Sequence, residues 1–127
     1  MPALLVSKSP PLRGELTVHG AKNSVLPILA ATLLCRTPCV LHNCPDILDV
    51  THALCMLRSL GCVYERRGAS IYIDTRGCTG GRIPPELAGA MRASGLFLGA
   101  LLARSGEAEL SLPGGCPIGE RPMDYHL

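Results

Sequence analysis

Aromatic residues are scarce in this sequence, and their scarcity limits what the protein can bind. Its 127 residues include no tryptophan, one phenylalanine and three tyrosines. Single-stranded nucleic acids are usually bound by aromatic rings that stack on bases and by basic clusters that follow the phosphates. The net charge is only +2, and no extended run of lysine or arginine occurs. The composition therefore disfavours nucleic acid as a partner.

Long apolar runs are missing as well. The longest uncharged apolar stretch covers residues 24–35 and contains Pro27, whereas a membrane-spanning helix needs about 20 residues. The first ten residues lack the basic start that is typical of a signal peptide. We therefore expect no membrane partner and a cytoplasmic location.

Glycine and proline, by contrast, are frequent. The chain contains 14 Gly and 11 Pro, while 47% of its residues are hydrophobic. This combination excludes a long coiled coil and predicts short elements, joined by tight turns, around a core of Leu, Ala, Val and Ile. The length fits one compact domain of the usual size of about 100 to 200 residues.

Cysteine is also abundant for a chain of this length. The number is odd and several cysteines lie in apolar segments, so buried thiols are expected rather than disulfide bridges. His42 lies among the first three cysteines, but no C-x-x-C pair occurs, which leaves a zinc site as the less favoured alternative. The seven are Cys35, Cys39, Cys44, Cys55, Cys62, Cys78 and Cys116.

Hydrophobic periodicity predicts the order β-α-β-α-β-β for the first part of the chain. The expected elements are a half-buried strand at 15–19, a buried helix at 23–35, a strand at 39–42, an amphipathic helix at 47–60 and strands at 62–65 and 70–74. Gly61 is placed to end the second helix, and Gly68 can supply a positive φ in the connection between the last two strands.

The second half begins the same alternation again. A loop at 77–85 is followed by a helical region at 86–104 and a strand-like segment at 107–112. Residues 113–122 contain three prolines and three glycines, so regular structure is not expected there. The pattern predicts one complete unit of roughly sixty residues and part of a second.

Lys22 is a candidate for anion binding. It is one of two lysines and lies in the sequence Gly20-Ala21-Lys22-Asn23, between a predicted strand and a predicted helix. Backbone N–H groups and the positive end of the helix dipole attract anions at such a junction, and an ammonium adds a point charge. The motif is not a P-loop, and an ordinary solvated lysine at a helix start is the alternative.

Cys116 differs from the other cysteines in its surroundings. Gly114, Gly115 and Pro117 flank it instead of core residues, so it is expected on an exposed loop. A loop thiol near a cation such as Arg121 can act as a nucleophile or a proton donor. The alternative is a surface cysteine in a tight turn.

Two arginines are candidates for gripping phosphate or carboxylate, because a guanidinium can donate two parallel hydrogen bonds. Arg92 precedes the apolar part of the second helical region, and Arg121 is followed closely by Asp124, which can accept from hydroxyl or amide donors. A solvent-facing charge and a plain turn are the alternatives.

Taken together, three motifs resemble the UDP-N-acetylglucosamine 1-carboxyvinyltransferase family of enolpyruvyl transferases. They are Gly20-Ala21-Lys22-Asn23, Met91-Arg92-Ala93-Ser94 and the stretch 113–124, which reads P-G-G-C-P-I-G-E-R-P-M-D. The resemblance implies transfer of the enolpyruvyl group of phosphoenolpyruvate to the 3-hydroxyl of UDP-N-acetylglucosamine, with release of phosphate. This is the first committed step of bacterial peptidoglycan synthesis, and in this family it needs no metal and no organic cofactor.

The resemblance also implies roles for individual residues. Cys116 corresponds to the family's proton donor and to the site of its covalent phosphoenolpyruvate adduct, and Lys22 and Asn23 correspond to contacts with phosphoenolpyruvate. Residues that correspond to contacts with UDP-N-acetylglucosamine are Arg92, Arg121, Pro122, Met123, Asp124 and Tyr125. Leu96 stands where an aromatic residue is common in the family.

The implied fold class is α/β, a mixed α+β arrangement that forms part of an inside-out α/β barrel built from βαβαββ units. Residues 1–20 correspond to a strand region that belongs to the other domain of the full-length family, and 21–127 to an incomplete enolpyruvyl-transferase domain. Family members have roughly 400 residues in two domains, and the missing C-terminal domain is expected to supply a general base and a further arginine. Two alternatives are a 3-phosphoshikimate 1-carboxyvinyltransferase and a non-catalytic module that binds phosphate or a nucleotide sugar.

Overall fold

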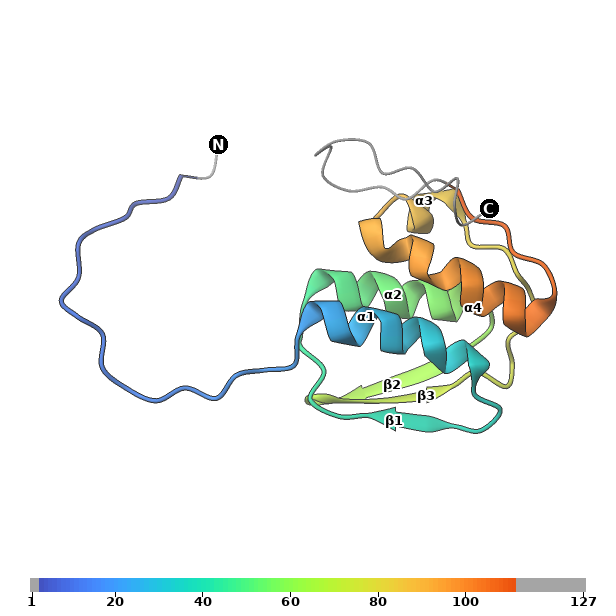
Figure 1. The fold of residues 1–127 in the computed structure, drawn as a ribbon, viewed down its shortest axis with the longest axis horizontal. Coiled ribbons are helices and arrows are strands. Elements are labelled where there is room, and N and C mark those ends of the chain that lie inside the picture. Colours follow the sequence, from blue (N-terminus) through green and yellow to red (C-terminus); the bar gives the residue numbers. More distant parts are fainter. Residues whose placement is uncertain (1–2, 112–127) are drawn as a thin grey trace.

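The computed structural model describes residues 3–111. Within them, a layer of helices covers one face of a small antiparallel sheet (Figure 1). No helix in this range is long and apolar enough to cross a membrane. The loop at 113–122 and six candidate site residues lie outside the described residues. These are Cys116, Arg121, Pro122, Met123, Asp124 and Tyr125.

The sheet has three strands in the order β1-β3-β2. β1 covers Cys39–Leu41, β2 covers Val63–Arg67 and β3 covers Ser70–Asp74, so all three predicted strands of this region are confirmed. The hairpin between β2 and β3 is tighter than the predicted four-residue connection, because β2 continues to Arg67 and pairs there with Ser70. Gly68 has a φ of 59°, as a tight hairpin turn requires.

The two helices predicted in the first unit are confirmed. α1 covers Lys22–Ala31 and continues as the 3₁₀ turn η1, Thr32–Leu34, and α2 covers Leu48–Ser59. The prediction that the first helix is buried all round is wrong, because only one side of α1 faces the core. Leu29 is fully buried, whereas Ile28 is 48% exposed.

The predicted continuous helical region at 86–104 is divided into three pieces. They are α3 (Pro85–Ala88), the 3₁₀ turn η2 (Arg92–Gly95) and α4 (Leu96–Ser105). Gly89 ends the first piece, and Met91 is extended with φ −147° and ψ 151°. Glycine has a low helix propensity, so the predicted helix is interrupted after α3. The apolar part of the predicted helix forms α4, and the residues between α3 and α4 form turns.

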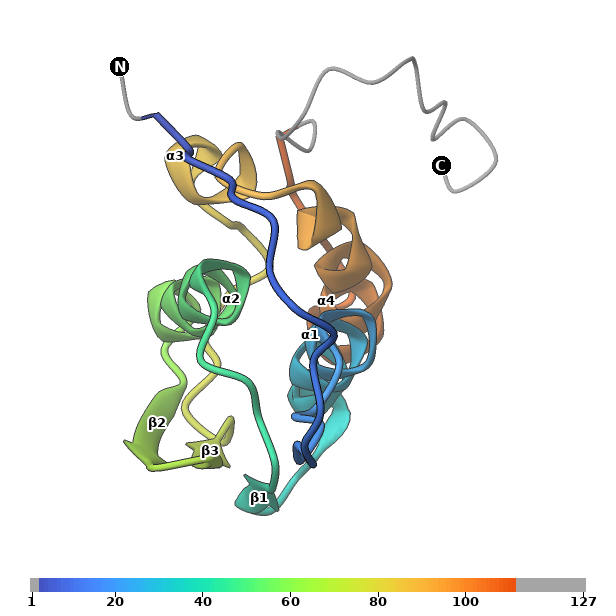
Figure 2. The same ribbon diagram turned by 90° about the vertical axis from the view of Figure 1, so that its left-hand side faces the viewer.

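Leucine and other aliphatic side chains fill the space between the helices and the sheet, as the composition predicts. Leu29, Leu57, Ile71, Phe97 and Leu101 are each fully buried and come from α1, α2, β3 and α4. Each buried side chain of this size contributes about 1.5–3 kcal/mol to folding. The core therefore fixes the positions of the three long helices, and α4 packs against α1 (Figure 2).

Two predicted strands are not formed within the described range. Residues 3–20 are extended without pairing to any described strand (Figure 1), and Leu16 and Val18 are 84% and 78% exposed. The segment at 107–111 makes only one parallel bridge, between Arg82 and Glu109. Alternating hydrophobicity indicates which side chains would face the core if the segment were a strand. The strand itself forms only where an adjacent strand hydrogen-bonds to its N–H and C=O groups.

Candidate anion-binding site

Lys22 is the first residue of α1, so the helix begins one residue before the predicted start at 23. The helix begins after Ala21, whose carbonyl oxygen accepts from the N–H groups of Ser24 at 3.1 Å and Val25 at 3.0 Å. No side chain caps this end, and its first turn contains no acidic residue. The amides of Lys22 and Asn23 precede the first intrahelical bonds, so this helix end presents backbone donors and a partial positive charge.

Gly20 sets the position of this helix end. A Cβ at Gly20 would collide with the backbone carbonyl oxygen of Asn43. Only glycine permits so close an approach of two backbones. The chain entering α1 therefore lies directly against the loop that leads from β1 to α2.

That loop is held in turn by Arg66 on β2. Its guanidinium donates to the carbonyl oxygens of Cys44 at 3.1 Å and Pro45 at 2.9 Å, and to the carboxylate of Asp46 at 2.7 Å. Hydrogen bonds from one arginine to three acceptors fix the loop that precedes α2. The sheet thus positions the start of α2.

The starts of α1 and α2 are joined by an ion pair. Lys22 Nζ lies against Asp49 Oδ2, and Asp49 is in the first turn of α2. The Lys22 side chain is 56% exposed and that of Asp49 is 26% exposed. The two helices therefore begin side by side, and the lysine ammonium lies between their N-terminal ends.

α4 begins at the same end of the molecule. Near its C-terminal end, Arg104 donates to the carbonyl oxygens of Cys35, which follows α1 and η1, and of Thr75, each at 3.1 Å. Because the C-terminal ends of α1 and α4 are joined and the two helices pack together, they run in the same direction. Figure 2 looks at the molecule from the end where α1 begins.

Arg92 belongs to this same end, because η2 leads directly into α4. Its side chain is half-buried. The structure therefore brings Lys22, Asn23 and Arg92 to one end of the helical layer, where three long helices begin. Their partial positive charges and the two cations all favour an anion there.

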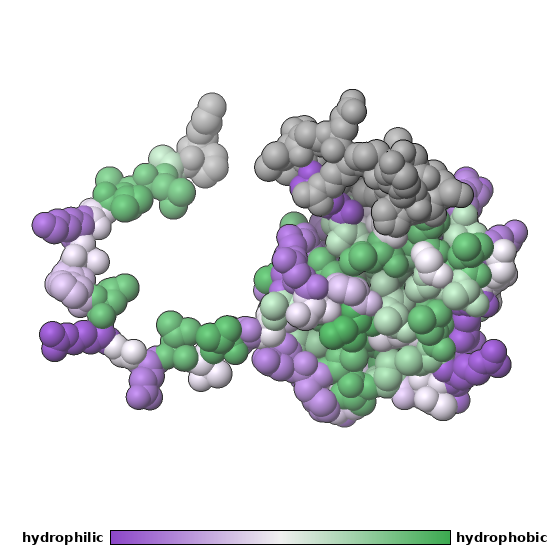
Figure 3. Space-filling model, in the orientation of Figure 1, coloured by the Kyte–Doolittle hydropathy of each residue, from purple (hydrophilic) through white to green (hydrophobic). Residues whose placement is uncertain are grey.

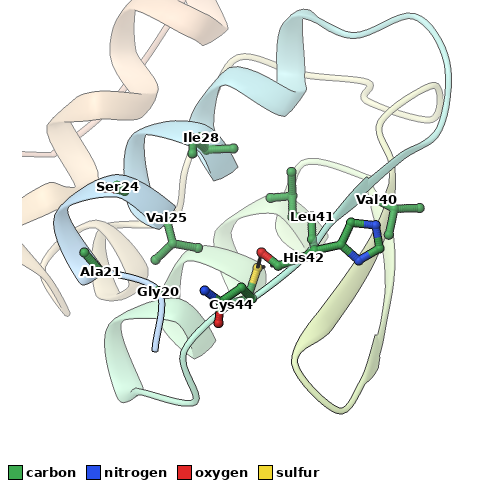
Figure 4. A pocket seen from close by; sticks show the side chains of 10 residues that line it. Gly20, Ala21, Ser24, Val25, Ile28, Val40, Leu41, His42 and Cys44 are labelled. Atoms are coloured by element: carbon green, nitrogen blue, oxygen red, sulfur yellow. Dashed lines mark hydrogen bonds between the residues drawn. The ribbon is translucent and has the colours of Figure 1, made fainter. Parts of the chain in front are cut away.

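A groove of about 440 Å³ lies beside this end, between α1 and the segment at 40–44 (Figure 4). Ala21, which precedes α1, and Ser24, in its first turn, line the groove, and Ile28 and Val40 make much of it apolar. Lys22, Asn23 and Arg92 are not among its lining residues. The groove and the cationic end therefore share the start of α1 but are separate features.

The described cysteines form no disulfide bridges, and two of them, Cys44 and Cys62, are buried. All six described cysteines are free, and no cluster of three or more His, Cys, Asp or Glu side chains within residues 3–111 is arranged to hold a metal ion. Burial raises the pKa of Cys44, which lines the groove, although Arg66 nearby acts in the opposite direction. Its thiol lies near the carbonyl oxygens of Leu41 at 3.6 Å and His42 at 3.9 Å.

Asp49 is the part of this site that sequence reasoning missed. From the sequence, Asp49 is interpreted as an ordinary acidic residue in the first turn of a helix. It lies 27 positions after Lys22, and no spacing rule connects residues on two different helices. Only the packing of α1 against α2 reveals the pair.

The chain is similar in sequence to carboxyvinyltransferases. Residues 6–127 match the family EPSP synthase (3-phosphoshikimate 1-carboxyvinyltransferase). Over 127 residues the chain is 46% identical to the UDP-N-acetylglucosamine 1-carboxyvinyltransferase of Psychrobacter arcticus, covering 100% of this chain and 30% of that protein. Over 116 residues it is 53% identical to UDP-N-acetylglucosamine 1-carboxyvinyltransferase 1 of Carboxydothermus hydrogenoformans, covering 91% of this chain and 27% of that protein.

A solved structure shows the same fold. The enolpyruvyl transferase NikO from Streptomyces tendae superposes with a TM-score of 0.69 at 27% identity, covering 76% of this chain and 23% of that chain. The mixed α+β arrangement predicted from the sequence is therefore that of an enolpyruvyl transferase. The chain spans about 30% of the length of the curated relatives it matches.

Proposed function

Because the chain belongs to the EPSP synthase (3-phosphoshikimate 1-carboxyvinyltransferase) family, we propose that it takes part in transferring an enolpyruvyl group from phosphoenolpyruvate to an acceptor hydroxyl. The acceptor that we propose is the 3-hydroxyl of UDP-N-acetylglucosamine, after which the relatives at 46% and 53% identity are named. The reaction would serve bacterial peptidoglycan synthesis.

The observation that carries this proposal is the cationic end of the helical layer. Phosphoenolpyruvate has a phosphate and a carboxylate, and a nucleotide sugar has a diphosphate. Lys22 lies where α1 and α2 begin, and Arg92 precedes the start of α4. Helix N-termini and fixed cations stabilise such anions more than water does, because they need no reorganisation when the ligand binds.

In the proposed reaction, the acceptor hydroxyl loses its proton to a general base, its oxygen adds to C2 of phosphoenolpyruvate, and a proton from an acid adds to C3. The resulting ketal then loses a proton from C3 and releases phosphate, which restores the double bond. We propose Cys116 as the donor of the proton to C3 and Lys22 and Asn23 as contacts to phosphoenolpyruvate. The proposed contacts to UDP-N-acetylglucosamine are Arg92, Arg121, Pro122, Met123, Asp124 and Tyr125.

We also propose the division of the chain that the resemblance implies. Residues 21–127 would form part of one enolpyruvyl-transferase domain, and 1–20 would contribute a strand to the other domain. The extended conformation and high exposure of Leu16 and Val18 support this division, because their alternation is that of a strand that lacks its neighbour. The general base and a further phosphoenolpyruvate-binding arginine would come from a C-terminal domain.

The related acceptor 3-phosphoshikimate is the second candidate, because the matched family carries that name. Both acceptors are anionic and both reactions use phosphoenolpyruvate. Titration of the protein with each acceptor in the presence of phosphoenolpyruvate distinguishes them. The proposal expects heat of binding with UDP-N-acetylglucosamine and none with 3-phosphoshikimate.

The proposed phosphoenolpyruvate site is tested by substituting the two lysines one at a time. We expect Lys22→Ala to weaken phosphoenolpyruvate binding in isothermal titration calorimetry by about 10- to 100-fold, because a charged hydrogen bond contributes about 1.5–3 kcal/mol. Lys8→Ala is the matched control, since Lys8 lies in the extended N-terminal segment and its loss removes the same charge. Equal affinities in the two variants would contradict the assignment.

A further inference from the structure

We propose that Asp49 is a positioning residue for this site, with its carboxylate holding the Lys22 ammonium between the N-terminal ends of α1 and α2. The inference rests on the proposed function, because it concerns how the cation that would bind phosphoenolpyruvate is held before the ligand arrives. Asp49 itself touches no substrate in this account.

The ion pair with Asp49 restricts the conformation of the Lys22 side chain. A lysine side chain has several rotatable bonds and loses rotamer freedom whenever its ammonium is fixed. Lys22 is more than half exposed, so little packing restrains it. The partner that the structure gives it is Asp49, which is less exposed and is held by its place in the first turn of α2. Asp49 therefore restrains an otherwise mobile cation.

The same ion pair offsets an unfavourable charge at the start of α1. A cation at a helix N-terminus is unfavourable, because the partial charge there has the same sign. Lys22 is at that position of α1, and its own helix offers no acidic residue in the first turn. The Asp49 carboxylate is at the favourable end of α2, and it also offsets the charge of Lys22. One carboxylate thereby makes it possible for the ammonium to stay where an anion would bind.

Asp46 provides a comparison within the same region. It precedes α2 by two residues, but its side chain is 91% exposed and pairs with Arg66. Substituting either aspartate with asparagine removes one negative charge near the starts of α1 and α2. Only the substitution of Asp49 removes the partner of Lys22.

The two effects of removing Asp49 have opposite signs, which makes the inference testable. If Asp49 only adds negative charge near an anion site, Asp49→Asn will tighten phosphoenolpyruvate binding by reducing repulsion. If it positions Lys22, the same substitution will weaken binding although it removes a negative charge. We expect about fivefold weaker binding for Asp49→Asn and partial recovery for Asp49→Glu. For Asp46→Asn we expect unchanged or slightly tighter binding, because Arg66 still holds the loop before α2 through two backbone carbonyl oxygens.

The experiment is a titration of wild type and these variants with phosphoenolpyruvate, combined with a double-mutant cycle. In the Lys22→Ala background the effect of Asp49→Asn should vanish, because no ammonium remains to be held. A purely structural role would instead weaken binding equally in both backgrounds and overturn the inference. Binding by Asp49→Asn that equals or exceeds wild type would also overturn it. Failure of wild type to bind phosphoenolpyruvate would contradict the proposed function itself.

Discussion

The Cys62 thiol shows how strongly the position of one residue determines its chemistry. Cys62 follows α2 and is 3% exposed, and its N–H donates to the carbonyl oxygen of Leu57 at 3.0 Å. Burial, with a further contribution from the neighbouring Cys78 thiol, raises the pKa of Cys62 to about 12. At neutral pH Cys62 is therefore a protonated packing group, as the sequence predicts for the cysteines in apolar segments.

We expect Cys62 to resist alkylation. Only the thiolate reacts with iodoacetamide, so a raised pKa and burial together slow the reaction. At pH 8, Cys55 on α2, which is only half-buried, should be labelled at least about tenfold faster than Cys62. The rate at Cys62 should rise as the pH approaches 12, because the thiolate fraction grows. Peptide mass spectrometry measures both rates, and equal labelling at pH 8 would contradict this account of Cys62.

Residues differ in how far the sequence alone could reveal their roles. The position of Lys22 at a helix start was predictable from local sequence, whereas its role in binding stays a prediction. The ion pair of Asp49 was not predictable, because its contact with Lys22 depends on the packing of two helices. The roles of Cys116 and Arg121 remain predictions that rest on resemblance.

At the scale of elements, glycines determine where helices begin and end and how stable they are. The apolar run at 96–103 correctly predicts α4, but Gly89 and the extended Met91 interrupt the longer helix that the pattern suggests. The start of α1 depends on Gly20, where two backbones meet. Periodicity identified the helices, whereas their ends follow from local backbone sterics.

Two glycine substitutions should change stability in opposite directions. Gly99 lies inside α4, and a Cβ added there would meet no atom within 4 Å. Gly99→Ala should raise the free energy of unfolding by about 0.5–1 kcal/mol, because alanine loses less entropy in a helix. Gly20→Ala should lower it by about 1–3 kcal/mol, because its Cβ would collide with the Asn43 carbonyl oxygen.

Urea denaturation of the two variants and wild type measures both changes. Gly20→Ala should in addition weaken phosphoenolpyruvate binding, since displacement of the start of α1 also moves Lys22. A Gly20→Ala variant as stable as wild type would contradict the close approach that positions α1.

At the scale of the whole molecule, the helical layer has two distinct surfaces. One is the cationic end, where α1, α2 and α4 begin. The other is an apolar surface over α1 and α4, which Figure 3 shows in green. Both helices carry exposed apolar side chains, such as Ile28 on α1 at 48% and Leu102 on α4 at 55% exposed. A large exposed apolar surface is unusual for an isolated domain. It is consistent with a chain that spans about 30% of the length of its relatives.

The convergence of three helix starts is the feature that periodicity could not predict. The order of elements from α1 to β3 was evident from apolar spacing and turn residues. The parallel direction of α1 and α4 becomes apparent only from their packing and from the contacts that Arg104 makes with Cys35 and Thr75. The candidate residues Lys22, Asn23 and Arg92 were therefore identifiable one by one, but their common location required the fold.

The central claim is that phosphoenolpyruvate binds at this cationic end, and backbone amide NMR during a titration tests it most directly. We expect the largest shift changes at residues 21–24, 48–50 and 92–96, where the three helices begin. Lys22→Ala should greatly reduce these changes. Shift changes centred on the opposite end, around Cys35, Cys62 and Arg104, or an absence of changes at the three helix starts, would contradict the account.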